Sequence, residues 1–373
     1  MSKSPAPGPS ADWSAVTKLS VSLTAALLGG LVAILIGLPN DRGGTFDGAP
    51  RYNAQYPSTE PTVQSNGDVS FRIAVVTDLD HDSKLADQAN TWQSFFRRGV
   101  LTLSHDWKRV SVAWDTASFP LRSTLAQGGR SMELSDLVVF DGHLLAVDDR
   151  TGVLYRIFEA DAKWHAIPWV LLADGDGSVP KGFKAEWLTV KDRLLYVGGL
   201  GKEWTTTEGV FQNYNPMYVK TVTHTGHVTH VNWVQQYKKI RAAAGIFAPG
   251  YMIHESAQWS AIHQKWFFLP RRASSEMYTE ADDEHRATNY LITADESFEQ
   301  VHAVRVGPLS KTRGYSAFQF IPGTDDRIIV ALKSEEDRGT IRSFISAFTV
   351  DGEVLMAETQ LEGAYKFEGI EFI

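Results

Sequence analysis

Three glutamates in this chain stand where a carboxylate is unfavourable, because each leads into an apolar run that is typical of a buried strand. They are Glu186, Glu255 and Glu368. An ionised carboxylate in such surroundings costs several kcal/mol unless a cation, a proton or hydrogen-bond donors compensate it, since even a neutral polar group without partners costs about 2 to 7 kcal/mol. Three such carboxylates in one chain favour a shared cation.

The runs that follow these glutamates belong to a repeat. In each repeat a residue with a side-chain oxygen begins a strand, a short turn follows, and a second apolar strand returns. Ser135 and Ser316 begin runs of the same layout, and successive members of the set of five are 51 to 69 residues apart. This period suits a four-stranded sheet with irregular loops, which is the unit of a β-propeller. The sequence therefore predicts an all-β, five-bladed β-propeller over residues 69–373.

The fifth repeat is incomplete. Glu368 begins a strand, and the chain ends at Ile373 before a second strand can follow. The apolar run 71–77, near the start of the propeller, can supply the missing strand and close the ring.

A hairpin returns its second strand to the end where its first strand began, so the residues after the second strands should lie beside the five oxygens. Asp78, Asp80 and Asp149 are expected there as candidates for activating a water molecule. Basic side chains at the same end would neutralise phosphate, and an indole ring would stack on a nucleobase. The basic and aromatic residues expected there are Arg271, Arg272 and Lys202, with Lys333 behind them, and Trp204.

The five oxygens predict a calcium site. The chain has no cysteine and no patterned histidines, and oxygen ligands alone favour Ca²⁺ or Mg²⁺. A wide, irregular ring of glutamate and serine suits the larger Ca²⁺. Arginines beside a dication are the combination that a phosphate needs. The predicted metal ligands are Ser135, Glu186, Glu255, Ser316 and Glu368.

The chain resembles the calcium-activated nucleotidases of the apyrase family from about residue 69 to its end. Stretches that carry the resemblance include Ile73-Ala-Val-Val-Thr-Asp-Leu-Asp80, Gly182-Phe-Lys-Ala-Glu-Trp187 and Phe268-Leu-Pro-Arg-Arg-Ala-Ser274. The resemblance implies one calcium ion in the central tunnel of a five-bladed propeller, with one ligand from each blade at the five positions named above. It also implies hydrolysis of nucleoside di- and triphosphates to the monophosphate, with UDP and GDP preferred over ADP.

Two other functions fit the same sequence. The propeller could be a calcium-stabilised module that binds nucleotides or glycans without turnover, because closed propellers host many functions. It could also be a calcium-dependent esterase or lactonase, which would hydrolyse neutral esters and would not need Arg271. Simpler readings exist for single residues, since Asp78 and Asp80 can each cap a turn, and a glutamate before a strand is most often solvated. The fivefold placement of the oxygens favours the metal site.

The N-terminal 68 residues are organised differently. Residues 19–38 contain 20 positions without a charge, which is long enough to span a bilayer core of about 30 Å. The sequence predicts a cytosolic tail at 1–18, a signal anchor at 19–38 and a stem at 39–68 that is rich in Gly, Pro, Ser and Thr. The predicted location is the endoplasmic reticulum or Golgi membrane, as a single-pass type II protein with a lumenal propeller. Secretion after cleavage is the alternative.

Composition limits the partners. The net charge of −8 argues against nucleic-acid polymers, and 373 residues with 43% hydrophobic content are enough for a large core. The expected partners are nucleoside di- and triphosphates and, through the anchor, a membrane. The sequence leaves the oligomeric state open, a homodimer included.

Overall fold

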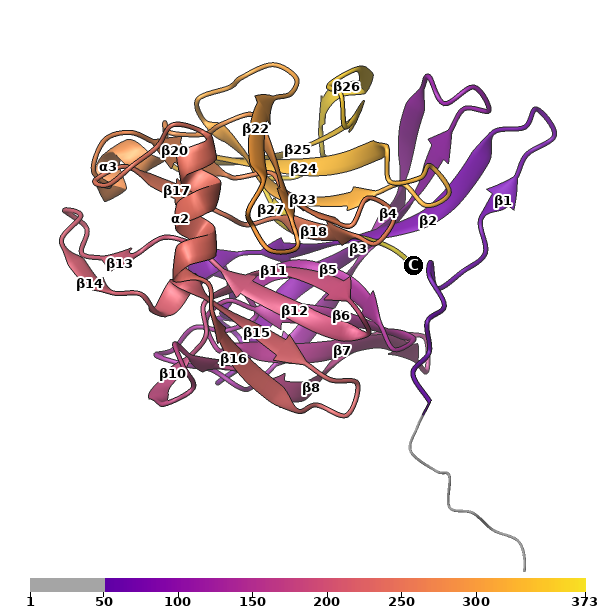
Figure 1. Cartoon of the computed structure of the whole chain (residues 1–373). Helices are drawn as coiled ribbons and strands as arrows, with labels where there is room; N and C mark the ends of the chain where they lie inside the picture. The colour runs from indigo at the N-terminus through magenta and orange to yellow at the C-terminus, as the bar shows by residue number, and fades with distance from the viewer. Residues whose placement is uncertain (1–50) are drawn as a thin grey trace, which may run out of the picture. The chain divides into compact units, whose positions relative to one another are not determined.

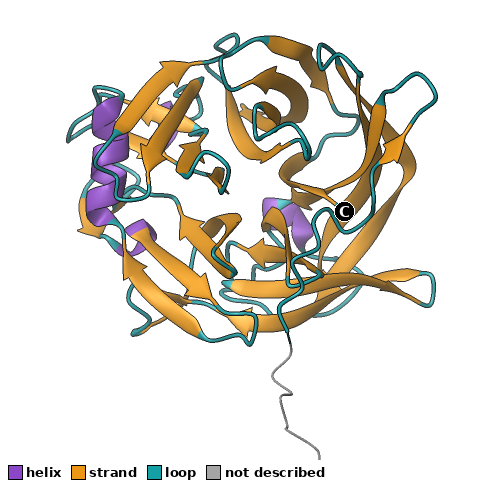
Figure 2. Ribbon diagram, turned by 45° about the vertical axis from the view of Figure 1, so that its right-hand side comes forward, coloured by secondary structure: helices purple, strands orange, loops and turns teal. Residues whose placement is uncertain are grey.

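The computed structural model describes residues 51–373, and these residues form sheets arranged in a ring (Figure 2). Four sheets have four antiparallel strands each, and the fifth joins the C-terminal strand to strands from the start of the described chain. Adjacent innermost strands contact one another all the way round the ring. The innermost strands are β5 (Leu134–Phe140), β11 (Ala185–Lys191), β18 (Ala257–Ser260), β23 (Arg313–Phe320) and β27 (Lys366–Phe372).

The outer strands follow in chain order in the first four blades. Blade one adds β6 (His143–Asp148), β7 (Val153–Ala160) and β8 (Lys163–Leu171), and blade two adds β12 (Leu194–Gly199), β15 (Tyr218–Val222) and β16 (Val228–Asn232). Blade three adds β19 (Lys265–Phe268), β21 (Tyr290–Asp295) and β22 (Val301–Arg305), and blade four adds β24 (Ile328–Asp337), β25 (Thr340–Thr349) and β26 (Val354–Gln360).

The fifth blade closes the ring as the sequence predicts. Strand β27 pairs antiparallel with β2 (Val69–Asp78), in a register that runs from Ile73 opposite Phe372 to Asp78 opposite Lys366. Strands β3 (Trp92–Leu103) and β4 (Val110–Ser123) complete this blade, and the short β1 (Thr62–Val63) extends its edge. The five-bladed propeller predicted from the repeat is confirmed.

Smaller elements decorate the ring. Helix α2 (Val234–Ala243) lies on the outside of the ring and is followed by Gly245 with a φ of +75°. The remaining elements are β9 (Ala173–Asp174), β10 (Val179–Gly182), β13 (Trp204–Thr205), β14 (Phe211–Asn213), β17 (Tyr251–Ile253), β20 (Arg272–Ser274), α3 (Glu280–Asp283), and the 3₁₀ turns η1 (Asp80–Ser83) and η2 (Asn215–Met217).

Each pair of neighbouring blades buries its own hydrophobic core. Between blades two and three, for example, Trp187 packs with Trp233 and Trp266, whose ring centroids are 5.0 Å apart. Four similar clusters fill the other interfaces, so every sheet is covered on both faces. This explains why most inner strands read as continuous apolar runs rather than as alternating ones. The apolar packing fixes the blades around the axis.

Hydrogen bonds near the axis also join each blade to the next. The side chains involved are buried, and an unpaired polar group there would cost free energy, so these bonds specify the ring geometry. In order round the ring, each bond runs from donor to acceptor as follows: Leu188 N to Asp136 Oδ2 (2.8 Å), Thr189 Oγ1 to Gln258 Oε1 (2.7 Å), Gln258 Nε2 to Phe318 O (3.1 Å), Ser316 Oγ to Phe367 O (3.0 Å) and Val139 N to Glu371 Oε2 (2.9 Å).

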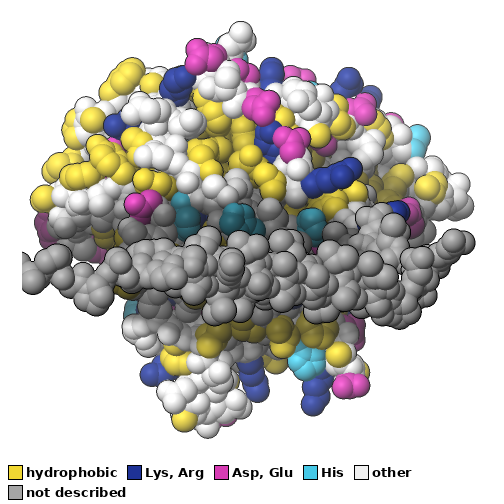
Figure 3. Space-filling view, turned by 60° about the horizontal axis from the view of Figure 1, so that its bottom comes forward, with side chains coloured by type: hydrophobic (Ala, Val, Ile, Leu, Met, Phe, Trp, Pro, Cys, Tyr) yellow, Lys and Arg dark blue, Asp and Glu magenta, His cyan; other side chains and the backbone are white. Residues whose placement is uncertain are grey.

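The residues just before the propeller lie against one end of the ring. Tyr56 donates a hydrogen bond to Glu371 at 2.9 Å, and Thr59 donates one to the carbonyl of Ile373 at 2.5 Å. In Figure 1, β1 and the C-terminus lie on one side of the ring, whereas α3, β13 and β14 lie on the other. On the described part of the face in Figure 3, acidic and basic side chains are interspersed with hydrophobic ones.

The predicted tail at 1–18, the anchor at 19–38 and the first part of the stem, 39–50, lie outside the described residues. Among residues 51–373, no helix is both long and apolar enough to cross a membrane. The structure therefore leaves the predicted membrane topology as a prediction.

Replacing Gln258 by leucine tests the hydrogen bonds between blades. Gln258 is 6% exposed, and its loss leaves the Thr189 hydroxyl and the Phe318 carbonyl without their partner. We expect Gln258→Leu to lower the free energy of unfolding by about 1 to 3 kcal/mol, measured by denaturant unfolding. Gln88→Leu, at an exposed position, is the control. Equal stability of the two variants would contradict the assignment.

Candidate active site

All five predicted metal ligands lie where the ladder of an inner strand is interrupted. The pairing of β5 with β6 shifts around Ser135, that of β11 with β12 shifts around Glu186, and that of β23 with β24 shifts around Ser316. Glu368 lies at the shift between β27 and β2, and Glu255 lies in the break between β17 and β18. A β-bulge re-aims one side chain without ending the strand. Five such irregularities at equivalent positions direct five oxygen-bearing residues to one level of the ring.

These five residues are buried. Each has an exposed fraction of 9% or less, and Ser135 Oγ has no hydrogen-bond partner among the described residues. Ser316 Oγ donates to a carbonyl and keeps its lone pairs free to accept. Buried oxygens with free lone pairs, drawn from all five blades, form a donor set that fits Ca²⁺, which binds oxygen ligands in irregular geometry.

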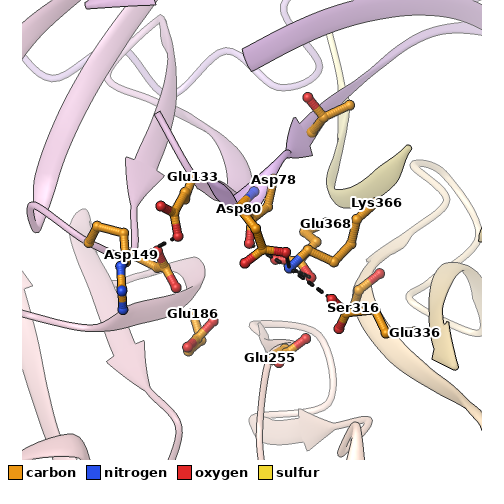
Figure 4. A network of polar contacts seen from close by, with 12 residues as sticks. Asp78, Asp80, Glu133, Asp149, Glu186, Glu255, Ser316, Glu336, Lys366 and Glu368 are labelled. Atoms are coloured by element: carbon orange, nitrogen blue, oxygen red, sulfur yellow. Dashed lines mark hydrogen bonds and ion pairs between the residues drawn. The ribbon is translucent and has the colours of Figure 1, made fainter. Parts of the chain in front are cut away.

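A cavity of about 360 Å³ opens at this level of the ring. Figure 4 shows the carboxylates of Asp78, Asp80, Glu133 and Asp149 near those of Glu186, Glu255 and Glu368. The two serines are buried and do not line the cavity. The cavity thus brings together ten of the thirteen predicted site residues: Asp78, Asp80, Asp149, Glu186, Lys202, Trp204, Glu255, Arg271, Arg272 and Glu368.

Acidic residues outnumber basic residues in the lining of this cavity. Eleven aspartates and glutamates line it, against seven lysines and arginines, so the lining carries four more acidic than basic groups. Burial, together with the neighbouring carboxylates, outweighs the nearby lysines and raises the pKa of Glu186 to about 8 and that of Glu368 well above its usual range. Both carboxylates would therefore be stabilised by an additional cation.

Arg271 is the basic residue that contacts two of the predicted metal ligands. Its guanidinium contacts Glu255, Glu368 at 2.8 Å and Glu336 at 2.5 Å. Burial alone would lower the pKa of Arg271, but the three carboxylates raise it well above its usual value. Arg271 therefore stays charged and joins blades three, four and five at the site.

Lys366 contacts a second group of acids, which overlaps with that of Arg271 at Glu336. Its ammonium lies 2.7 Å from both Asp78 and Asp80 and 3.5 Å from Glu336. Burial opposes ionisation of Asp80, but Lys366 outweighs it and lowers the pKa of Asp80 to about 2. Burial raises the pKa of Asp78 to about 6 despite the same lysine. Of these two aspartates, Asp78 has the pKa closer to that of a general base working near neutral pH.

Asp149 is the third predicted acid. Lys184 contacts Oδ2 of Asp149 and lies 2.9 Å from Glu186. Burial would lower the pKa of Lys184, but these two acids outweigh burial and raise it well above its usual value. The other oxygen of Asp149, Oδ1, is buried and has no hydrogen-bond partner among the residues described. That oxygen remains free to accept a proton or a hydrogen bond from a bound molecule.

Comparisons with known proteins identify the family. The model of the Apyrase family matches residues 79–373. The chain is 56% identical over 322 residues to "Soluble calcium-activated nucleotidase 1" of Mus musculus, covering 86% of this chain and 78% of that protein. It is 52% identical over 310 residues to "Apyrase apy-1" of Caenorhabditis elegans, covering 82% and 85% of the two chains. The chain belongs to the apyrase family.

Likeness to solved structures is low. The alpha-L-arabinanase of Penicillium chrysogenum superposes with a TM-score of 0.33 at 11% identity, covering 82% of this chain and 97% of that one. A likeness at this level supports no conclusion about the function of this chain.

The apyrase site contains residues that the sequence reading missed. Glu133, Lys184 and Lys366 line the cavity, and each stands two positions before a predicted ligand. Side chains two apart on a strand share a face, so this spacing was the signal that could have found them.

Carboxylate atoms of Asp78, Asp80 and Glu133 lie within 4.8 Å of one another, which makes this group a second possible metal position. Arg130 already contacts Glu133 at 2.5 Å and Asp80 at 3.1 Å.

The expectation for Lys333 is wrong. Lys333 is buried and contacts Glu358 of β26 at 3.0 Å and the ring of Tyr315 at 4.7 Å, and it does not line the cavity. Strand β24 continues for four residues beyond Lys333, to Asp337, so its strand does not end at the mouth where the hairpin argument placed it. Glu336, near the true end of this strand, reaches the cavity instead.

Gly314→Ala tests the placement of the arginine pair. A Cβ at Gly314 would lie 2.4 Å from Arg271 Cγ, 2.6 Å from the Arg271 carbonyl oxygen and 2.7 Å from Arg272 Nη1, so the backbone at Arg271 and both arginine side chains must shift. We expect kcat/KM for a nucleotide to fall on the order of 100-fold, because displacements of about 1 Å have effects of this size. Thermal unfolding of the same sample separates this loss from misfolding. Activity within twofold of the unaltered chain would contradict the placement.

The pH dependence of substrate binding tests Lys202. Burial lowers the pKa of Lys202 to about 8, so its ammonium is charged below that pH and loses its proton above it. We expect KM for a nucleotide substrate to rise up to about tenfold by about pH 9, as the charged fraction falls to about one tenth. In Lys202→Arg the side chain stays charged, and the rise should disappear. The same rise in both proteins would exclude Lys202 as the cause.

Proposed function

We propose that this apyrase family member hydrolyses nucleoside diphosphates and triphosphates to the monophosphate in a calcium-dependent reaction. The observation that carries the proposal is the charge of the cavity, where acidic groups outnumber basic groups by four. A polyphosphate anion cannot be attracted to such a site without an additional cation. The names of the relatives, calcium-activated nucleotidase and apyrase, support the same substrates and the same ion.

Ser135, Glu186, Glu255, Ser316 and Glu368 would hold the ion, since they supply oxygen donors from all five blades at one level. Bound there, calcium would act as a Lewis acid on phosphate oxygens. Arg271 now neutralises Glu255 and Glu368. With those carboxylates committed to a metal, the guanidinium of Arg271 becomes available to phosphate oxygens.

Arg272 and Lys202 complete the phosphate contacts. Arg272 is 3% exposed, its Nη1 has no partner among the described residues, and it lines the cavity. Lys202 uses two of its three donors on Glu203 O and Thr205 Oγ1 and keeps one for a ligand. These groups would stabilise the charge that spreads over the phosphoryl oxygens as the bond breaks.

Water activation is assigned to an aspartate. Lys366 and Arg130 hold Asp80 ionised, and its low pKa makes it a weak base. Asp78, with a pKa of about 6, and Asp149, with a free Oδ1, remain as candidates. Asp78→Asn and Asp149→Asn distinguish them, because loss of the base should lower kcat more than KM.

The alternative function is a propeller that binds nucleotides without hydrolysing them. For the proposed enzyme, the expected substrates are UDP, GDP and ADP in the lumen or outside the cell. The location in the endoplasmic reticulum or Golgi, through an N-terminal anchor, stays part of the proposal and would be tested by localising the full chain.

Phosphate release measures the proposed function. With UDP, GDP or ADP, we expect release in the presence of calcium and a loss of at least about 100-fold on chelation or in Glu255→Gln, because the ion stabilises transition-state charge. Glu353→Gln, at an exposed position just before β26, is the control and should retain full activity. Binding of nucleotide without phosphate release would favour the non-catalytic module, and turnover that survives chelation would contradict the metal assignment.

A further inference from the structure

A second cavity of about 310 Å³ lies beside the candidate active site and shares Lys202, Thr205 and Tyr278 with it. The side chains beyond this shared edge are largely apolar. Figure 1 shows the β13 and β14 strands on the same side of the ring as α3 and β20. The apolar side chains that line the second cavity are Phe211, Tyr214, Ala248, Pro249 and Met277.

Several of these side chains are unusually exposed for their type. Phe211 is 50% exposed, Met277 is 51% exposed and Tyr214 is 39% exposed. The rings of Phe211 and Tyr214 lie 4.8 Å apart at an interplanar angle of 55°, and together they form an aromatic corner. Exposed aromatic groups beside a polyanion site are the surface that a flat ring attached to a phosphate chain would cover.

Charge in this second cavity is already balanced. Arg241 binds both oxygens of Glu203, at 2.9 Å and 3.1 Å, and it is 5% exposed. Lys202 is the remaining charged residue of the lining, and it lies at the edge shared with the first cavity. The strongly acidic cavity therefore suits a metal and phosphates, whereas the adjoining one suits an uncharged aromatic group.

Trp204, the ring expected from the sequence to stack on a base, is less available. The ammonium of Lys181 lies 4.8 Å from its ring, and the indole packs against a cluster of Leu200, Tyr251 and Ile253. Trp204 is therefore engaged by the protein itself. Phe211 is not covered in this way, since half of its side chain remains exposed.

We propose that the cavity of Phe211, Tyr214 and Met277 binds the nucleoside end of the substrate, with the base stacked on Phe211. Lys202 then lies between the two cavities, where it contacts the phosphate nearest the ribose. This inference rests on the proposed function, and it makes the hairpin of β13 and β14 the element by which the enzyme distinguishes nucleotides from phosphoanhydrides that lack a nucleoside.

Phe211→Ala tests the proposal, with two probes that share phosphoanhydride-like chemistry. One is α,β-methylene-UDP, which carries a nucleoside, and the other is imidodiphosphate, which does not. We expect the Kd of α,β-methylene-UDP, measured by calorimetry with calcium, to rise about 5- to 100-fold, as removal of a stacking ring usually does. The Kd of imidodiphosphate should change by less than about twofold, because the phosphate contacts are intact. KM for UDP should rise by a factor similar to that for the nucleoside analogue.

The matched control is Phe158→Ala, which removes a phenylalanine of similar exposure, 45%, from β7. It should leave both dissociation constants unchanged, and thermal unfolding verifies that both variants are folded. An unchanged Kd for α,β-methylene-UDP in Phe211→Ala would overturn the proposal, as would an equal loss for both probes. Failure of the unaltered chain to release phosphate from any nucleotide would refute the proposed function instead, and the binding measurements would still decide where the nucleoside lies.

Discussion

The crowding of acidic side chains at the axis of the ring is the constraint on which the site depends. Carboxylates from neighbouring blades are held close together in a partly enclosed space, where their mutual repulsion is weakly screened. Arg271 and Lys366 reduce this repulsion, yet the acidic groups of the cavity still outnumber the basic ones by four. A dication on the axis is the simplest way to complete the balance, and it would also allow a polyphosphate to approach.

The fold maintains this arrangement through interactions that lie away from the chemistry. Five hydrophobic cores between blades and a belt of hydrogen bonds near the axis prevent the acidic residues from moving apart. Gly369 illustrates how close the inner strands come, because a Cβ at this position would lie 2.8 Å from the backbone of Asp136. Blades five and one therefore meet at backbone distance directly beside Glu368, and the ring tolerates little expansion at the level of the site.

The repeat in the sequence was sufficient to predict the ring, its closure by β2 and the five axial oxygens, because each of these follows from a period of the chain. Glu133, Lys184 and Lys366 obey the two-residue alternation of a strand, but nothing local marks them, since lysine and glutamate also occupy solvated edges. Lys333 was misplaced because β24 runs further than the hairpin pattern indicated. The aromatic corner of Phe211 and Tyr214 belongs to an irregular insertion between β12 and β15, where no period constrains the chain. Contacts that depend on such loops become visible only in three dimensions.

The most direct test of the central claim is the position of the metal in a crystal of the chain grown with calcium, measured by anomalous scattering. We expect one peak on the axis, with oxygens of Ser135, Glu186, Glu255, Ser316 and Glu368 at about 2.3 to 2.6 Å or joined to it through water. A peak among Asp78, Asp80 and Glu133 alone, or no calcium in the ring, would contradict it.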